Sequence, residues 1–241
     1  MRIAMISMAG ILAVSAFAVA AQDTHTLAWN PKKGDKTKYQ MKMTGDMDFG
    51  QGPMPLEVRI STESEVKNIV DDQITVTSKI SKFELFMNGE DMTQMAGGGT
   101  EIPDVTRVMS RRGELIKSDA NDMVNNPRLE QMQAFVYPDK PLKIGETWTH
   151  EFKGDKEKNV PKARAKFTLD ALEEKDGKAV YKLTYAFSEL ETPGKPMGSM
   201  GTMWVLRDSG DPYRIDGTIN DASFAEGMPP MNMKFEMQKV D

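Results

Sequence analysis

The sequence predicts a mainly β protein: antiparallel sheets from two related halves, with one short helix between them. Three observations lead to this fold class. Apolar and polar residues alternate with a period of two in most segments after residue 24, as in half-buried strands. Turn signals such as Asp176-Gly177 separate these segments, and the order of features repeats along the chain. We expect a duplicated unit, arranged as a sandwich or as one curved, clamp-like sheet.

The first 21 residues are expected to be a cleavable signal peptide and to take no part in the fold. Arg2 supplies a positive charge, and residues 3–20 are apolar apart from two serines. Ala18-Val19-Ala20 gives the small-x-small pattern of a cleavage site, with the cut after Ala20 or one residue later. The protein is therefore expected to be exported, to the periplasm or the medium, and to keep no stable transmembrane segment after cleavage.

The strands of the first half begin soon after this segment. Lys36 to Met43 alternate in polarity, and Val58 to Ser64 continue the pattern. A turn at Asp71-Asp72 follows, and then two further alternating runs, Ile74 to Ile80 and Phe83 to Met87. These runs predict a long hairpin.

The second half has the same kind of pattern. A strand contains Trp148, a hairpin from Ala163 to Ser188 turns at Asp176-Gly177, and Met231 to Gln238 alternate near the end of the chain. Glycine-rich and proline-rich loops are expected at residues 50–55, 97–99 and 193–201.

One segment between the halves has helical character. Asn126 is a good N-cap, Pro127 suits the first helical position, and residues 128–135 lack the period-2 pattern. Pro138 and Pro141 stop the helix.

The repeated order of features predicts an internal duplication. Lys33-Gly34-Asp35 opens a strand in the first half, and Ile144-Gly145-Glu146 opens one in the second. A hairpin follows in both halves. The third block is Val108 to Gly113 in the first copy and Val205 to Gly210 in the second, each followed by an aspartate six residues later.

The duplication gives a division of the chain. We expect the first β repeat over residues 22–119, a helical connector over 120–141 and the second β repeat over 142–241. Each copy has too little apolar surface for a good core alone, so the two are expected to pack together or to share a sheet.

The frame from Pro138 to Trp148, with the strand-opening pair Gly34-Asp35 as its counterpart, resembles one found in uncharacterised secreted bacterial proteins, a domain of unknown function with two similar halves. The resemblance implies an exported β protein and provides no catalytic residues. A more general architectural likeness is to periplasmic lipid-carrier β-clamps, in which a curved antiparallel sheet wraps a helix.

Composition excludes several classes of function. The net charge is −5 with the charges interspersed, so no footprint for nucleic acid is present. Cysteine is absent, only two histidines occur, and no nucleophile elbow, zinc motif or phosphate loop is present. His150 is expected to be a residue on a face of the sheet, and the acidic pairs at 71–72, 90–91 and 173–174 to be solvated in turns or loops. We therefore expect no enzyme activity and no cofactor.

Methionine is the one unusual feature of the composition. Seventeen of the 20 methionines follow the signal segment. Thioethers are soft ligands that select Cu(I), and Met197, Met200 and Met203, in or near a loop, are the candidate copper ligands. Met41, Met43, Met231, Met233 and Met237 share the parity of aromatic neighbours and are expected to face a core. Flexible methionines also suit an apolar pocket for lipid or another hydrophobic ligand.

The sequence thus predicts an exported, non-enzymatic binding or envelope-associated module. A hydrophobic ligand and Cu(I) remain as alternative partners. The first predicts a concave face lined by Met, Phe and Leu, and the second predicts converging sulfurs.

Overall fold

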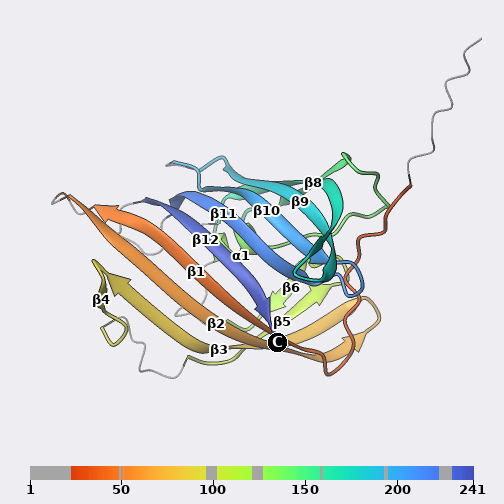
Figure 1. Cartoon of the computed structure of the whole chain (residues 1–241), viewed down its shortest axis with the longest axis horizontal. Helices are drawn as coiled ribbons and strands as arrows, with labels where there is room; N and C mark the ends of the chain where they lie inside the picture. Colours follow the sequence, from red (N-terminus) through yellow and green to blue (C-terminus); the bar gives the residue numbers. More distant parts are fainter. Residues whose placement is uncertain are drawn as a thin grey trace, which may run out of the picture.

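Strands make up most of the described chain and belong to one antiparallel sheet (Figure 1). The computed structural model describes residues 23–48, 50, 52–95, 102–120, 127–157, 160–192, 195–222 and 230–241. Over these ranges the elements are β1 (Lys36–Asp48), β2 (Pro53–Val70), β3 (Gln73–Met87), β4 (Glu90–Asp91), β5 (Val105–Ser110), β6 (Leu115–Ser118), α1 (Pro127–Gln133), β7 (Thr147–Phe152), β8 (Lys162–Lys175), β9 (Lys178–Leu190), β10 (Gly198–Leu206), β11 (Pro212–Ala222) and β12 (Met231–Val240).

The sheet consists of two meanders that meet at its centre. Its order is β6-β5-β3-β2-β1-β12-β11-β10-β9-β8-β7, with the short β4 beside β3. The first strand pairs with the last, Met41 opposite Met237. Over the described ranges, the mainly β, antiparallel fold class with one short helix is confirmed. Of the two arrangements, the chain adopts one curved sheet, and its two halves share it.

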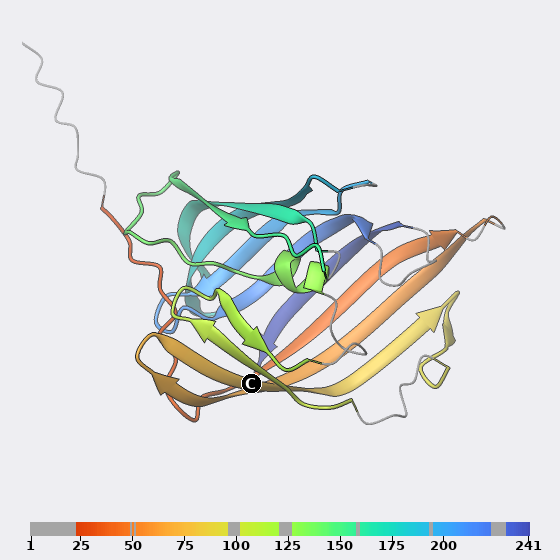
Figure 2. The same ribbon diagram turned by 180° about the vertical axis from the view of Figure 1, so that it is seen from behind.

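Alternation decides which face of the sheet is buried. In β1, Lys38 and Lys42 are exposed, whereas Met43 is buried. In β8, Ala163, Ala165, Phe167 and Leu169 are buried at every second position. α1 lies on this apolar face, and the sheet curls around it (Figure 2). We call this the inner face. The signal peptide and the glycines at 97–99 lie outside the described residues.

The two alternating runs of the first half form one long strand, β3. The register shifts between Ser61 and Thr62, which pair with Lys82 and Ile80, so Ser81 is an extra residue. This β-bulge reverses the parity of the strand. Even-numbered residues up to Ile80 and odd-numbered residues from Phe83 therefore share the inner face. The loops expected at residues 50–55 and 193–201 extend too far, because β2 already begins at Pro53 and β10 at Gly198.

Matched contacts open the two halves. In the first half, Gly34 N–H donates to the carbonyl of Val66 (2.8 Å), and Val66 N–H donates to the carbonyl of Asp35 (2.9 Å). In the second half, Gly145 N–H donates to the carbonyl of Leu169 (2.7 Å), and Leu169 N–H donates to the carbonyl of Glu146 (3.0 Å). These contacts agree with two related halves. The division at residues 119 and 142 stays a prediction.

Each half also ends a strand in a glycine turn against which another part of the chain packs. Gly113 follows β5 and Gly210 follows β10, both with positive φ (81° and 78°). A Cβ added at Gly113 would collide with the carbonyl oxygen of Phe135, and one at Gly210 with that of Ala28. Glycine is needed at both turns for conformation and for the close approach of a crossing segment.

Gly210→Ala is expected to destabilise the fold by roughly 3 kcal/mol or more, because strain at positive φ adds to the collision with Ala28. Gly177→Ala is the matched control: Gly177 has φ 74° but nothing within 4 Å of a new Cβ, so a loss of about 1–2 kcal/mol is expected. Urea unfolding of the two variants measures the difference. Equal losses would show that the close approach is unimportant.

Candidate functional site

Two ion pairs fix α1 over the inner face. Arg128 donates from two nitrogens to the two carboxylate oxygens of Glu189 in β9, both at 2.6 Å. The Glu189 side chain is 1% exposed, and its Oε2 also accepts the N–H of Met197 (2.8 Å). The hydrogen bonds to Glu189 raise the pKa of Arg128. This pair holds the start of α1 to the second half of the sheet.

The second ion pair ties α1 to the first half. Arg107 in β5 donates through Nε (3.0 Å) and Nη2 (2.8 Å) to one oxygen of Glu130. α1 is therefore joined to both sides of the curved sheet.

The inner face of the second half is filled. Phe135, just after α1, packs edge-on against Tyr137 and Phe167, and Trp148 stacks on Phe167 at 5.1 Å. The cluster continues across β8 to β11 with residues that are almost completely buried: Leu169, Leu183, Phe187, Met203, Val205, Ile215 and Ile219. This packing leaves the second half as an ordinary core.

The inner face of the first half is hollow under α1. Two neighbouring hollows, of about 410 and 300 Å³, lie between α1 with residues 134–137 and strands β1, β2, β3 and β5. They share part of their lining: Ser64, Ser78, Arg107, Met109, Gly113, Gln133 and Ala134. We call the two hollows together the α1 groove. Its size lies within the range of small-molecule sites, roughly 300–1,000 Å³.

One end of the α1 groove is apolar. Met41, Ile60, Ile80, Val105 and Leu129 line the larger hollow. Met41 and Ile60 face each other across β1 and β2 and are only half-buried.

The apolar end continues into a methionine-rich cluster. Its buried members are Met43, Met47, Leu56, Met231 and Met233, and Met41, Ile60, Phe235 and Met87 pack against them. Of the five methionines expected to face a core, Met43, Met231 and Met233 are buried, and Met41 and Met237 are partly buried against the core clusters.

A belt of polar groups crosses the middle of the α1 groove. Thr62 lies opposite Tyr39, and the hydroxyls of Ser64 and Ser78 form a hydrogen bond across β2 and β3 (2.7 Å). Arg107 continues this belt on β5. Burial raises the pKa of Tyr39, and the negative charge of Asp211 raises it further. The groove is thus amphipathic, with hydrogen-bonding groups beside an apolar floor.

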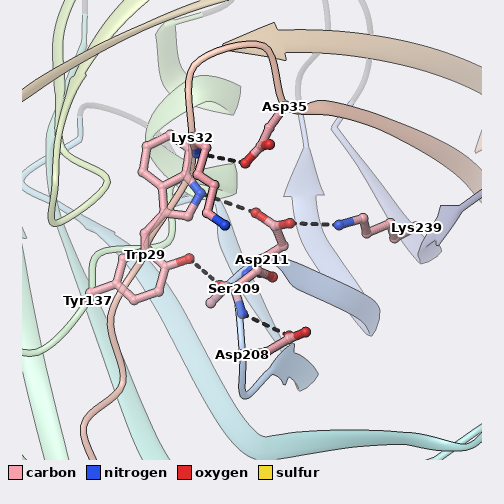
Figure 3. Close-up of polar contacts among 9 residues, drawn as sticks. Trp29, Lys32, Asp35, Tyr137, Asp208, Ser209, Asp211 and Lys239 are labelled. Atoms are coloured by element: carbon pink, nitrogen blue, oxygen red, sulfur yellow. Dashed lines mark hydrogen bonds and ion pairs between the residues drawn. The ribbon is translucent and has the colours of Figure 1, made fainter. Parts of the chain in front are cut away.

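The far end of the groove is closed by a structural network (Figure 3). Asp211 accepts the indole N–H of Trp29 (3.2 Å) with one oxygen and the ammonium of Lys239 (2.6 Å) with the other. Tyr137 donates its hydroxyl to the carbonyl of Gly210 (2.6 Å). Both oxygens of Asp211 have partners, so we assign this carboxylate to anchoring the segment before β1.

The three candidate copper ligands lie in or next to a strand, and the structure does not bring them together. Met197 and Met203 are buried in the core of the second half. Met200 sits on the opposite face of β10 and is 55% exposed. The expected loop is replaced by strand from Gly198, whose alternation separates Met200 from Met203. Copper binding by these residues stays a prediction without a converging set of sulfurs.

His150 and the acidic pairs, the other residues considered from the sequence, lie in or between strands of the sheet. His150 lies on the inner face of β7, with its ring against Phe152 and Nδ1 3.7 Å from Glu114. Burial lowers the pKa of His150. The acids at 90–91 and 173–174 lie in strands β4 and β8, which corrects their placement in loops. Within the described ranges, no three His, Cys, Asp or Glu side chains are placed to hold a metal ion together.

The polar residues that line the α1 groove were not predicted from the sequence. The sequence does contain a signal for them. Thr62, Ser64 and Ser78 are polar, although they occupy the alternate positions of β2 and β3 that are otherwise apolar. Glu189 likewise shares the parity of the buried Leu183 and Phe187. In the described part of the chain, no helix is long and apolar enough to span a membrane.

Comparisons with known proteins show only distant likeness. No family model and no curated protein sequence matches the chain. Lipovitellin, in a structure that describes its lipid–protein interactions, is similar over 87% of this chain with 9% identity and a TM-score of 0.47, and this chain spans only 25% of that protein.

Two bacterial structures are also similar. One is a Bacteroides fragilis protein with a YmcC-like fold, for which export is inferred (13% identity, TM-score 0.35, covering 90% of this chain and 100% of that one). The other is a DUF1329 family protein of Desulfovibrio piger (12% identity, TM-score 0.26, covering 86% and 85%). At these scores the likenesses transfer no function.

Arg128→Met is expected to destabilise the protein by about 3 kcal/mol, because Glu189 would remain charged and buried. The double variant Arg128→Met/Glu189→Gln removes that charge and keeps an acceptor for Met197 N–H, so it should recover most of the loss. Urea unfolding measures both. A double variant no more stable than Arg128→Met would contradict the assigned role of the pair.

Proposed function

We propose that this protein binds a hydrophobic ligand, without catalysis, in the α1 groove. The main support for this proposal is the difference in packing between the inner faces of the two halves of the sheet. The inner face of β8 to β11 is filled by aromatic and aliphatic side chains, whereas Met41 and Ile60 remain half-buried beside a hollow of about 410 Å³. Apolar side chains that line a hollow favour an apolar occupant, because each buried CH₂ contributes about 0.8 kcal/mol.

The groove lining suits ligands of variable shape. Met41 and Met109 line the groove directly, and further methionines extend its apolar end. Unbranched, polarisable side chains adapt to irregular partners. We further propose that this binding takes place outside the cytoplasm, in the periplasm or medium, as the first 21 residues suggest.

Filling the groove should weaken binding. Ile60→Trp places a large side chain in the larger hollow, so the affinity for the neutral fluorescent probe N-phenyl-1-naphthylamine should fall about tenfold or more. The measurement is a fluorescence titration, with circular dichroism to confirm folding.

Ser61→Trp is the matched control. Ser61 pairs with Lys82 and Gln40 on the outer face of the same strand. A tryptophan there should leave probe binding unchanged. Unaltered binding by folded Ile60→Trp would rule out the α1 groove as the site.

A further inference from the structure

Arg107 is the charged group best placed to meet a ligand in the α1 groove. It lines both hollows, at the point where the apolar end meets the polar belt. Its side chain is 29% exposed, whereas that of its partner Glu130 is 17% exposed. A guanidinium in such a position faces any molecule that enters.

The Arg107 guanidinium keeps hydrogen-bonding capacity. The bonds to Glu130 use Nε–H and Nη2, both directed at a single carboxylate oxygen. Arginine has five N–H donors in a planar fork, which suits bidentate binding of a carboxylate. Its paired residues on the neighbouring strands, Val76 and Ser118, carry no charge, and Glu130 is the acid that pairs with it in the described part of the chain.

The acids at the far end of the groove do not compete for Arg107. Asp211 is bound to Lys239 and Trp29, and Asp35 accepts the backbone N–H of Lys32. The carboxylate that Arg107 holds is therefore supplied by α1, the element that covers the groove.

We infer that the ligand is a single-chain amphiphile with a carboxylate head, bound by Arg107, and that Glu130 is its internal competitor. This inference rests on the proposed function. The head lies at the belt of Ser64, Ser78 and Arg107, and the chain runs toward Met41 and Ile60. Two hollows of about 410 and 300 Å³ suit one acyl chain and not the two chains of a diacyl lipid.

The test compares oleate with oleyl alcohol, which has the same chain and no charge, by displacement of N-phenyl-1-naphthylamine at pH 8. The wild-type protein should bind oleate about tenfold more tightly than the alcohol, because a hydrogen bond to a charged group adds to burial of the chain. Arg107→Gln should lower the affinity for oleate about tenfold more than the affinity for the alcohol, and so remove this difference.

Glu130→Gln should act in the opposite direction. It frees Arg107 from its competitor, so the ratio of the affinity for oleate to the affinity for the alcohol should rise severalfold. A purely structural ion pair would make both variants lose affinity for both ligands, because α1 would shift in each. The double variant Arg107→Gln/Glu130→Gln serves as the control without a charge at either position.

The outcomes separate the two proposals. Equal affinity of the wild type for oleate and oleyl alcohol, or parallel losses in both single variants, would overturn the carboxylate inference and leave the hydrophobic groove standing. Absence of binding by the neutral probe and by both ligands would overturn the proposed function itself.

Discussion

The fold depends on one crossing of the chain over the inner face of the sheet. Residues 135–142 run from α1 toward β7, and Tyr137 joins the two glycine turns: its N–H donates to Arg112 (2.8 Å) and its hydroxyl to Gly210 (2.6 Å). Leu142 exchanges backbone hydrogen bonds with His25 at the end of this crossing. An open sheet must cover its apolar face with something. Here one short helix and one extended segment do so, and they bond to both halves of the sheet.

The second half of the inner face is covered more completely than the first half, and this difference accounts for the α1 groove. Phe135 and Trp148 fill the second half, and each large side chain buried there contributes about 1.5–3 kcal/mol. α1 is anchored to the second half by Arg128–Glu189, and Phe135 just after it packs into the core there. The α1 groove therefore persists because the second half supplies the stability and fixes the position of the helix.

Much of the fold follows from local pattern. The hairpins at Asp71-Asp72 and Asp176-Gly177 and the helix at Pro127 were predictable because turn chemistry and alternation act over a few residues. The α1 groove was not, because it is created by contacts distant in sequence, such as the pairing of β1 with β12 and of Arg128 with Glu189. The same limit explains the copper candidates: spacing suggested a common site, and the strand placed Met200 on the other face.

The most direct test of the account is a crystal structure of the protein with a long-chain carboxylate that carries bromine on its chain. The bromine gives an anomalous signal that locates the chain without interpretation of weak density. The account predicts a peak on the inner face, between Leu129 of α1 and Ile60 of β2. A peak on the outer face, or a groove filled by the protein's own side chains with no bromine bound, would contradict it.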